Sequence, residues 1–318
     1  MLNIHQISVP TPYLIGPVNS YLIKNPPYTL VDPGPETGVA KKALVDGLAS
    51  LGVAPNDIAR VVLTHSDSDH SGLARWLGEE RGAAVYVHKL EMRKLTFDYD
   101  YYRERLPFLR EAGLPLKALK EILEDYDPVV KPVLPRTKVE ALHGGEVLDF
   151  EGGFLRVLHL PGHSGGHICL YDPEGRRFLA GDFILKHITP NPIMEADPAD
   201  FSKRSPALTQ YLEGLEVLEK LDLGVILPGH GKTMDDHKEA VNRARKHHAR
   251  RLEAVASLLG KNSLSAYQVM RSIYPGIRGF QIFLGISEVF AHLDYLLAQG
   301  RITRISRGEV SFYSTKNE

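Results

Sequence analysis

A dense group of metal-binding side chains follows directly after a short apolar segment in the first quarter of the chain. Residues 61–63 are apolar, and residues 64–72 read Thr-His-Ser-Asp-Ser-Asp-His-Ser-Gly. Within six positions this loop offers two imidazoles and two carboxylates, from His65, Asp67, Asp69 and His70. Such ligands suit divalent transition metals, which lower the pKa of a bound water toward neutrality. A fold for this chain must therefore hold the loop at the end of a strand and turn its ligands toward one point.

Three later segments have the same arrangement of an apolar run, a glycine and a metal-binding side chain. Residues 160–164 read Leu-Pro-Gly-His-Ser, residues 180–182 read Ala-Gly-Asp, and residues 227–231 read Leu-Pro-Gly-His-Gly. The side chains that they present are His163, Asp182 and His230. A glycine lets the backbone turn sharply or approach another segment closely. One such histidine is weak evidence, because most histidines are surface or core residues, but four such segments in one chain predict a shared metal centre.

Together the four segments resemble the signature of the metallo-β-lactamase-fold hydrolases, which is His-x-His-x-Asp-His, then a glycine-flanked His, a bridging Asp and a final His. The likeness covers about residues 1–232. It implies an α/β fold of the αββα sandwich type, with the site at one sheet edge, and a centre of two divalent metal ions. The ligands that the resemblance implies are His65, Asp67 and His163 for the first metal, Asp69, His70 and His230 for the second, and Asp182 as the bridge.

The second histidine of the family motif is replaced by Asp67 in this chain. A carboxylate in place of an imidazole adds a negative charge and hardens the first site, which favours iron or manganese, with zinc as an alternative. The flavodiiron branch of the family is similar in having a carboxylate here, and it uses iron. That branch also carries a flavodoxin module, whereas this sequence has no flavin-binding segment. A single-metal enzyme with a weakened first site is the remaining alternative.

The resemblance implies hydrolysis by a hydroxide that two cations hold and activate for attack on a carbonyl or phosphoryl group. Asp69 is the family's usual candidate for orienting this nucleophile, so it is the predicted catalytic residue. For substrate contact the sequence offers His187, five residues after the bridging Asp182, and the aromatic side chains of Tyr99 and Tyr102. Ordinary loop polarity and aromatic packing explain these three residues equally well.

The order of predicted elements indicates an α/β architecture for the first two thirds of the chain. Apolar runs bounded by turn residues predict strands, and apolar residues at helical spacing predict helices. The predicted strands are at 4–9, 20–23, 28–31, 59–63, 83–87, 154–160, 167–171, 177–180 and 224–227, and the predicted helices are at 38–51, 71–81 and 205–221. Strands that alternate with helices are typical of layered α/β folds. Asp-Pro-Gly at 32–34 is expected to be a turn.

Residues 90–135 interrupt this alternation with an aromatic segment and two predicted helices, at about 101–112 and 115–126. A helical insert between core strands is often a lid over a site. A packing excursion that covers a sheet edge is equally consistent with the pattern.

Residues 235–318 are predicted to form a separate domain, which leaves 1–234 as the catalytic domain. Helices at 235–259, 265–272 and 286–299, followed by a hairpin at 301–313, are in the order of a winged helix. The segment resembles the winged helix appended to one branch of the superfamily, which includes a single-strand-specific endoribonuclease. From residue 237 onward there are 13 Lys and Arg against 6 Asp and Glu, which could hold nucleic-acid phosphates. A module that packs on the catalytic domain or mediates a homodimer is the favoured alternative.

Composition narrows the class of protein only modestly. The formal net charge of −1 indicates neither a polyanionic nor a polycationic partner. The single cysteine, Cys169, lies in an apolar run and is expected to be a buried core thiol, so no disulfide is expected within the chain. The sequence starts without a charged segment followed by an apolar stretch, and no uninterrupted run approaches about 18 apolar residues. A cytoplasmic protein that does not span a membrane is therefore predicted.

We expect a metal-dependent hydrolase that cleaves an ester-type bond, meaning a thioester, a lactone or a carboxylic ester, in a small or medium-sized anionic substrate. The catalytic part resembles glyoxalase II, which motivates this expectation. One alternative is a phosphodiesterase or ribonuclease that uses the same metals and binds nucleic acid with the winged helix. Another is a metal-dependent nucleic-acid-binding regulator without turnover. Loops set the substrate in such folds, so the metal signature by itself names none.

Overall fold

The first of two facing sheets has six strands, in the order β1-β2-β3-β4-β5-β6. The computed structural model describes residues 1–95, 101–125, 139–260 and 263–316. The six strands span, in that order, Ile4–Val9, Val18–Ile23, Thr29–Val31, Arg60–Leu63, Ala84–His88 and Val139–Leu142. The first three pair antiparallel, whereas β3 to β6 run parallel. The carboxyl ends of β3, β4 and β5 therefore lie at one edge of the sheet.

The second sheet has five strands, in the order β13-β10-β9-β8-β7. They span, in that order, Val225–Pro228, Arg177–Gly181, Ile168–Asp172, Gly153–His159 and Val147–Phe150. The pair β10 and β13 is parallel, and the other neighbours are antiparallel. Because β10 and β13 are parallel, the loops that follow them leave the sheet at the same edge.

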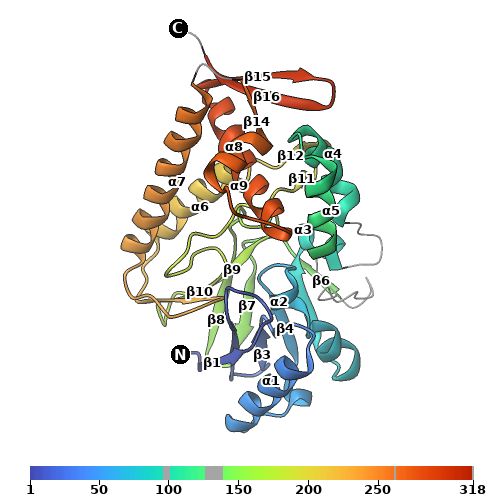
Figure 1. Cartoon of the computed structure of the whole chain (residues 1–318). Coiled ribbons are helices and arrows are strands. Elements are labelled where there is room, and N and C mark those ends of the chain that lie inside the picture. Colours follow the sequence, from blue (N-terminus) through green and yellow to red (C-terminus); the bar gives the residue numbers. More distant parts are fainter. Residues whose placement is uncertain (96–100, 126–138, 261–262, 317–318) are drawn as a thin grey trace.

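Helices cover the outer faces of both sheets. The helices of the sandwich are α1 (Gly38–Ser50), α2 (Ser68–Ser71), α3 (Lys89–Met92), α6 (Ala207–Lys220) and α7 (His237–Leu259). In β4, Val61 and Leu63 pack in the core on the α1 side, whereas Val62 packs between the sheets. In β9, Cys169 faces the core under α6, whereas Leu170 faces the other sheet. This alternation gives the layer order helix, sheet, sheet, helix (Figure 1), which confirms the predicted sandwich and the buried thiol.

The predicted insert packs against the C-terminal helices. The remaining elements are α4 (Tyr101–Glu111), α5 (Leu116–Asp125), β11 (Ala196–Asp197), β12 (Asp200–Arg204), β14 (Leu264–Ser265), α8 (Ala266–Ile273), α9 (Phe280–Ala298), β15 (Ile302–Arg307) and β16 (Val310–Thr315). One hydrophobic cluster contains Phe108 and Ile122 of the insert together with Val255 of α7 and Phe290 of α9. Figure 1 shows these helices and the β15–β16 hairpin stacked at the end of the molecule opposite α1.

The side chain of Arg204 joins three segments of the hydrophobic core that the insert shares with the C-terminal helices, which we call the upper core. Arg204, at the end of β12, donates from Nε and Nη2 to the two carboxylate oxygens of Asp294 in α9, at 2.8 Å each. Its Nη1 donates to Glu111 in the insert at 2.5 Å, and its guanidinium lies 3.8 Å from the ring centroid of Phe290. The insert and the residues after 234 thus share one core. The division at residue 234 and the winged-helix assignment stay predictions.

The central helix of this core, α9, is the most apolar helix of the chain's C-terminal part. By length and composition alone, α9 could cross a membrane, but most of it is buried against neighbouring helices. Burial on nearly all sides accounts for its composition. It starts at Phe280, six residues before the predicted start at 286, and Asp125 of the insert accepts a hydrogen bond from the Phe280 N–H at 2.8 Å. That cap comes from a distant segment, so a local pattern does not reveal it.

Other differences from the predicted elements are local. The predicted helix at 71–81 is wrong in detail, because α2 begins earlier, at Ser68, and a π-helical turn spans Trp76–Glu80. The strands β6, β7, β11 and β12 were not predicted, since their short runs carry few β-branched or aromatic residues.

Candidate metal centre

The seven predicted metal ligands lie together at one edge of the sandwich. Each comes from a loop or helix that directly follows a strand: His65, Asp67, Asp69 and His70 after β4, His163 after β8, Asp182 after β10, and His230 after β13. Their donor atoms form three groups, each within 4.8 Å: His65, Asp67 and His163 (the first site); Asp69, His70 and His230 (the second site); and His65, His70 and Asp182 between them. These are the triples and the bridge that the sequence resemblance implied.

The donor atoms are spaced as the ligands of a cation would be. In the first site, Oδ2 of Asp67 lies 3.6 Å and 3.5 Å from the Nε2 atoms of the two histidines. In the second site, His230 Nε2 lies 3.3 Å from Asp69 Oδ2 and 3.2 Å from His70 Nε2. Donors at about 2.0–2.2 Å from a tetrahedral cation are about 3.3–3.6 Å from one another. The distances in both sites are close to that range.

Hydrogen bonds at Nδ1 turn the Nε2 lone pair of every histidine ligand inward. The Nδ1 atoms lie 2.9–3.0 Å from acceptor oxygens, which are Thr64 Oγ1 for His65, Asp32 Oδ2 for His70, Asn191 O for His163 and Pro17 O for His230. Carbonyl and carboxylate oxygens only accept, so Nδ1 carries the proton in the last three. The Thr64 hydroxyl donates to Asp32, so it accepts from His65. Fixing the tautomer in this way is typical of metal-binding histidines.

Two atoms of the centre lack the partner that a metal would supply. His65 Nε2 and Asp182 Oδ1 are buried and have no hydrogen-bond partner among the described residues. Such groups are rare in folded proteins because desolvation without compensation is costly. Gly229 keeps the space open, since a Cβ there would lie 2.4 Å from Asp182 Oδ1 and 2.8 Å from His70 Cε1. The residues present therefore fit a dinuclear metal centre.

Asp32 supports the second site through a hydrogen bond with one of its histidines. This role was missed from the sequence, because Asp32 was treated only as part of a turn. Its carboxylate accepts hydrogen bonds from the backbone N–H and hydroxyl of Thr64, at 2.8 Å and 2.7 Å, as well as from His70. Burial alone would lower the pKa of His70, but the charges of Asp182, Asp32 and Asp69 hold that pKa well above its usual value. A backbone φ of 54° at Asp32 is uncommon for a residue with a side chain and marks an over-determined position.

Glu91 of α3 anchors the first site, and it was also missed. Its buried carboxylate accepts from the Ser66 N–H at 3.1 Å, the Ser164 hydroxyl at 2.6 Å and the Gly166 N–H at 2.9 Å. Ser66 lies between two ligands in sequence, and Ser164 follows a third. Lys94 donates to Glu91 at 2.8 Å and also to Glu195. Burial opposes ionisation, but Lys94 and the hydrogen bonds hold the pKa of Glu91 well below its usual range. One carboxylate thus ties both ligand loops of the first site together.

His167 lies beside the centre but belongs to none of the donor groups, as expected for a supporting residue. Its Nε2 accepts a hydrogen bond from the Asp182 backbone N–H at 3.1 Å. Burial, and then the neighbouring histidines His65 and His163, hold its pKa well below the usual value. A neutral His167 with an unprotonated Nε2 fits both facts and helps to fix the bridging carboxylate.

The two sites differ in solvent exposure. The side chain of Asp67 is 42% exposed, whereas those of Asp69 and His230 are 13% and 3% exposed. Burial lowers the pKa of His163, but Asp67, whose Oδ2 lies 3.5 Å from its Nε2, and the nearby Asp182 raise that pKa to about 9. The open edge of the centre is therefore at the first site, where substrate and solvent can reach the carboxylate that replaces the family's histidine.

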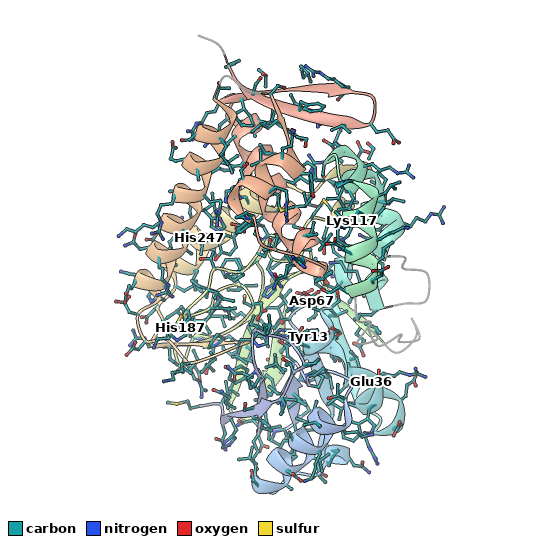
Figure 2. All side chains as sticks on the ribbon, in the orientation of Figure 1. Tyr13, Glu36, Asp67, Lys117, His187 and His247 are labelled. Atoms are coloured by element: carbon teal, nitrogen blue, oxygen red, sulfur yellow. The ribbon has the colours of Figure 1, made fainter. Side chains whose placement is uncertain are left out.

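Of the three predicted substrate residues, only His187 has a side chain in the part of the chain that the structure describes, and it lies away from the centre. Figure 2 shows His187 well apart from Asp67, and its side chain is exposed. Tyr99 and the side chain of Tyr102 lie outside the described residues. A tyrosine that was not predicted is nearer: the Tyr13 hydroxyl, on the loop between β1 and β2, lies 2.7 Å from the Ser68 hydroxyl of α2 (Figure 2). No pattern around Tyr13 distinguishes it from a surface aromatic residue.

Four of the 13 basic residues from residue 237 onward pair with described carboxylates of the same chain. Hydrogen bonds or ion pairs to carboxylates are made by Arg245 with Glu219, Arg251 with Glu288, Arg301 with Glu253 and Arg304 with Glu111. Arg243 donates to the Leu185 carbonyl at 3.2 Å. A cation that already has a carboxylate beside it attracts a phosphate less strongly, so these four arginines are weaker candidate phosphate sites than the sequence suggested.

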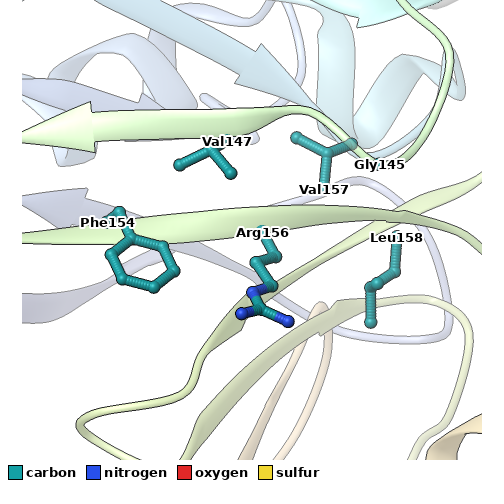
Figure 3. A pocket seen from close by; sticks show the side chains of 6 residues that line it. All are labelled: Gly145, Val147, Phe154, Arg156, Val157 and Leu158. Atoms are coloured by element: carbon teal, nitrogen blue, oxygen red, sulfur yellow. The ribbon is translucent and has the colours of Figure 1, made fainter.

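Two surface cavities are lined by none of the metal ligands. One, of about 530 Å³, is on the outer face of β7 and β8, where Val147, Phe154, Arg156 and Leu158 line it (Figure 3). The other, of about 500 Å³, is lined by Gln6, Lys186, Gly231, Lys232, Thr233 and Asp235. Neither contains a predicted ligand, but the second adjoins the loop that carries His230.

Comparison with known protein families shows the family to which a chain with this site belongs. A family model described as the metallo-beta-lactamase superfamily matches residues 14–230, which include all seven candidate ligands. The chain belongs to the metallo-beta-lactamase superfamily. It is similar to the probable metallo-hydrolase YqjP of Bacillus subtilis, with 32% identity over 97% of each chain. Family and relative agree with the site, so this member of the superfamily is a metal-dependent hydrolase.

Two further proteins are similar to this chain, one over a smaller part of its sequence and one in its solved structure. An acyl-coenzyme A thioesterase of Gallus gallus, MBLAC2, is 28% identical over 61% of this chain and 66% of its own length. A metallo-beta-lactamase family protein of Thermus thermophilus has a solved structure that superposes with a TM-score of 0.83, at 29% identity, and the match covers 98% of both chains. That match extends beyond residue 230, so the C-terminal part accompanies the sandwich in at least one other superfamily member.

Proposed function

We propose that the protein hydrolyses an ester-type bond, and that a thioester is its preferred substrate among thioesters, lactones and carboxylic esters. The observation that carries the proposal is the pair of three-donor sites that meet at the buried Asp182. When bound there, divalent cations supply Lewis acidity for a carbonyl oxygen and acidify water. That chemistry suits acyl transfer to water without a covalent enzyme intermediate.

The residues of the chain divide the work between holding the metals and orienting the reaction. His65, Asp67 and His163 would hold the first metal, with Glu91 fixing their loops. The second would be held by the Asp69, His70 and His230 side chains. Asp69 is partly exposed and adjoins both sites in sequence, so it is the candidate to orient the attacking water. The Tyr13 hydroxyl, beside Ser68, is positioned to contact a substrate at the open edge.

The names of several relatives support a thioester. MBLAC2 from Gallus gallus and from Homo sapiens is an acyl-coenzyme A thioesterase, at 28% and 27% identity over 61% and 62% of this chain. An atrochrysone carboxyl ACP thioesterase of Aspergillus fumigatus is 26% identical over 34% of this chain. These are partial likenesses, and they bear on the bond that is cleaved rather than on the acyl group.

A nucleic acid substrate is not favoured, because four of the arginines that could bind phosphates pair with carboxylates of the same chain. A cytoplasmic location, a homodimer, and iron, manganese or zinc as the metal remain part of the proposal as predicted from the sequence.

The test is a substrate panel assayed after the metal content of the purified protein has been measured. The panel contains an acyl-coenzyme A, an acyl-N-acetylcysteamine thioester, a lactone, a nitrophenyl ester and single-stranded RNA. We expect turnover of the thioesters that needs metal. Turnover of RNA alone would overturn the ester proposal and favour the nuclease alternative, and turnover of nothing with both metals bound would favour a regulator.

A further inference from the structure

The cavity beside the His230 loop is polar and built on the same strands as the metal centre. Two of its lining residues, Lys186 and Lys232, follow metal ligands: Lys186 is four residues after Asp182, and Lys232 is two residues after His230. The strands before these ligands, β10 and β13, pair in parallel, with Gly181 opposite Pro228. Both lysines therefore leave the sheet at the edge where the ligands leave it.

The loop that carries Lys232 is firmly held. Ile226 and Met234 form a β-bridge that closes the loop at its base, with hydrogen bonds of 2.7 Å and 3.1 Å. The buried side chain of Asn19 donates to the carbonyl oxygens of Pro228 and Gly231, at 2.9 Å each. The cavity wall and the ligand His230 are thus parts of one rigid loop, so a group bound in the cavity has a fixed place relative to the centre.

The cavity offers positive charge that the protein does not neutralise. Neither Lys186 nor Lys232 forms a hydrogen bond or ion pair with any described residue, unlike the arginines of the C-terminal part. Asp235 is the one acidic residue among the six that line the cavity. Gly231, Lys232 and Thr233 are exposed, and their backbone N–H groups donate to no described residue. Lysine ammonium and backbone N–H groups together are typical of phosphate sites.

The loop between β1 and β2 exposes apolar side chains beside the centre. This loop is tied to the centre by the Tyr13 hydroxyl and by the Pro17 carbonyl, which accepts from His230. Between these two contacts it carries Leu14, which is 96% exposed, and the partly exposed Ile15. An apolar surface and a basic cavity near one hydrolytic centre match a substrate with an apolar acyl part and a phosphorylated part.

We propose that the cavity binds a phosphate of the leaving group, so that the substrate is an acyl thioester of a phosphorylated thiol of the coenzyme A type. This inference rests on the proposed thioesterase function and specifies which half of the substrate the protein recognises. Lys186 and Lys232 contact the phosphate, and the carbonyl carbon lies at the metal centre. Water adds its oxygen to the acyl carbon, the carbon–sulfur bond breaks, and the thiol leaves with a proton from that water.

The test compares two substrates that share an acyl group and differ in the thiol. Octanoyl-coenzyme A carries phosphates, and the octanoyl thioester of N-acetylcysteamine carries none. The protein variants are Lys186→Glu with Lys232→Glu, and the matched control Lys117→Glu with Lys120→Glu, a pair of exposed lysines on α5 with the same change of charge. We expect the ratio of kcat/KM for the coenzyme A ester over the N-acetylcysteamine ester to fall about tenfold or more in the cavity variant only.

Inhibition by free coenzyme A gives a second readout that does not depend on the thioester bond. We expect coenzyme A to inhibit hydrolysis of the N-acetylcysteamine ester competitively, and to do so about tenfold less well in the cavity variant. The neutral variant Lys186→Gln with Lys232→Gln, which disturbs folding less, should shift both readouts in the same direction by a smaller factor.

The outcomes separate this inference from the proposed function. If the unmodified protein hydrolyses both thioesters and the ratio is equal in all variants, the cavity does not bind the leaving group, while the thioesterase function stands. An equal fall in the cavity and control variants would mean a general charge effect and would also overturn the inference. If the unmodified protein hydrolyses neither thioester, the function fails, and the assignment of the leaving group fails with it.

Discussion

In the second site, Asp69, His70 and His230 are largely buried, and the charged carboxylate of Asp32 supports one of the histidines directly. In the first site, Asp67 is 42% exposed, and Glu91 supports the ligands only through the backbone and hydroxyl groups of their neighbours. A buried site with a charged partner binds a cation more tightly than an open site held through neighbours. We therefore expect the second site to hold its metal more tightly, and the more open first site to exchange its metal more readily.

The replacement of the family's histidine by Asp67 falls on the open half. A carboxylate there adds charge at a place where water can screen it, so the cost of an extra anion in the centre is reduced. The same carboxylate in the buried half would stand beside Asp32, Asp69 and Asp182. We therefore expect a carboxylate at position 67 to be tolerated in the open half and to set the metal preference of the first site.

The largest expected effect is that of removing the bridge between the halves. Asp182→Ala should lower kcat/KM by at least about 10³-fold, because both sites lose a shared ligand. Metal content by elemental analysis should fall below two equivalents. Asp46→Ala, which removes an exposed carboxylate on α1, is the control. Unchanged hydrolysis in Asp182→Ala would rule out a shared centre.

The second-largest expected effect is a loss of metal affinity that falls mainly on the buried second site. Asp32→Asn should lower the metal affinity of the second site by about 10–100-fold, since His70 loses its charged partner, and should lower that of the first site less, since Asp32 reaches His65 only through the Thr64 hydroxyl. Competition with a chelating dye that resolves the two equivalents measures this. An equal loss at both sites would show that Asp32 supports the fold in general rather than one site.

A smaller effect is expected from the open side. Glu91→Gln should weaken the first site by about tenfold, because an amide cannot accept every N–H and O–H that the carboxylate accepts. Glu195→Gln is the matched control, since Glu195 shares Lys94 but makes no contact with Ser66 or Ser164. Both proteins should melt at similar temperatures, and the same dye competition applies. The prediction is wrong if the control loses as much first-site affinity as Glu91→Gln.

The contrast between the halves also shows what the sequence could and could not reveal. The seven ligands were predicted because they are grouped in short segments whose spacing resembles a family signature. Asp32 and Glu91 were missed because each reaches its partners across the fold: Asp32 is 38 residues from His70, and Glu91 is 75 residues from Gly166. An aspartate in Asp-Pro-Gly and a glutamate on a short helix look like ordinary surface residues until burial is known.

The fold follows the same division. The alternation of strands and helices was predicted because apolar runs bounded by turn residues and apolar residues at helical spacing leave a local pattern, and the sandwich was implied by the family resemblance. The upper core was not predicted, because it depends on contacts between residues far apart in the sequence. Arg204, for example, contacts Asp294 and Glu111, each about 90 residues away along the chain. Such contacts decide how the insert and the C-terminal helices pack, and no local pattern records them.

The smallest expected effect restores the family's residue. Asp67→His should raise the affinity of the first site for zinc about tenfold and shift its preference away from manganese, with kcat changed by less than about tenfold. Metal competition at equal concentrations of zinc and manganese, read by elemental analysis, measures the shift. Ser68→Ala is a control that leaves the donor set intact. An unaltered zinc-to-manganese ratio would mean that position 67 does not bind metal.

The inequality of the two halves is tested most directly by graded removal of metal. The protein, loaded with two equivalents of one divalent metal, is dialysed against increasing chelator, and the metal that remains is counted at each step. We predict a plateau at one equivalent, reached while the protein stays folded, and we predict that Asp32→Asn abolishes the plateau. Loss of both equivalents in a single step from the unmodified protein, or a protein that never holds more than one, would contradict a centre with a buried and an open half.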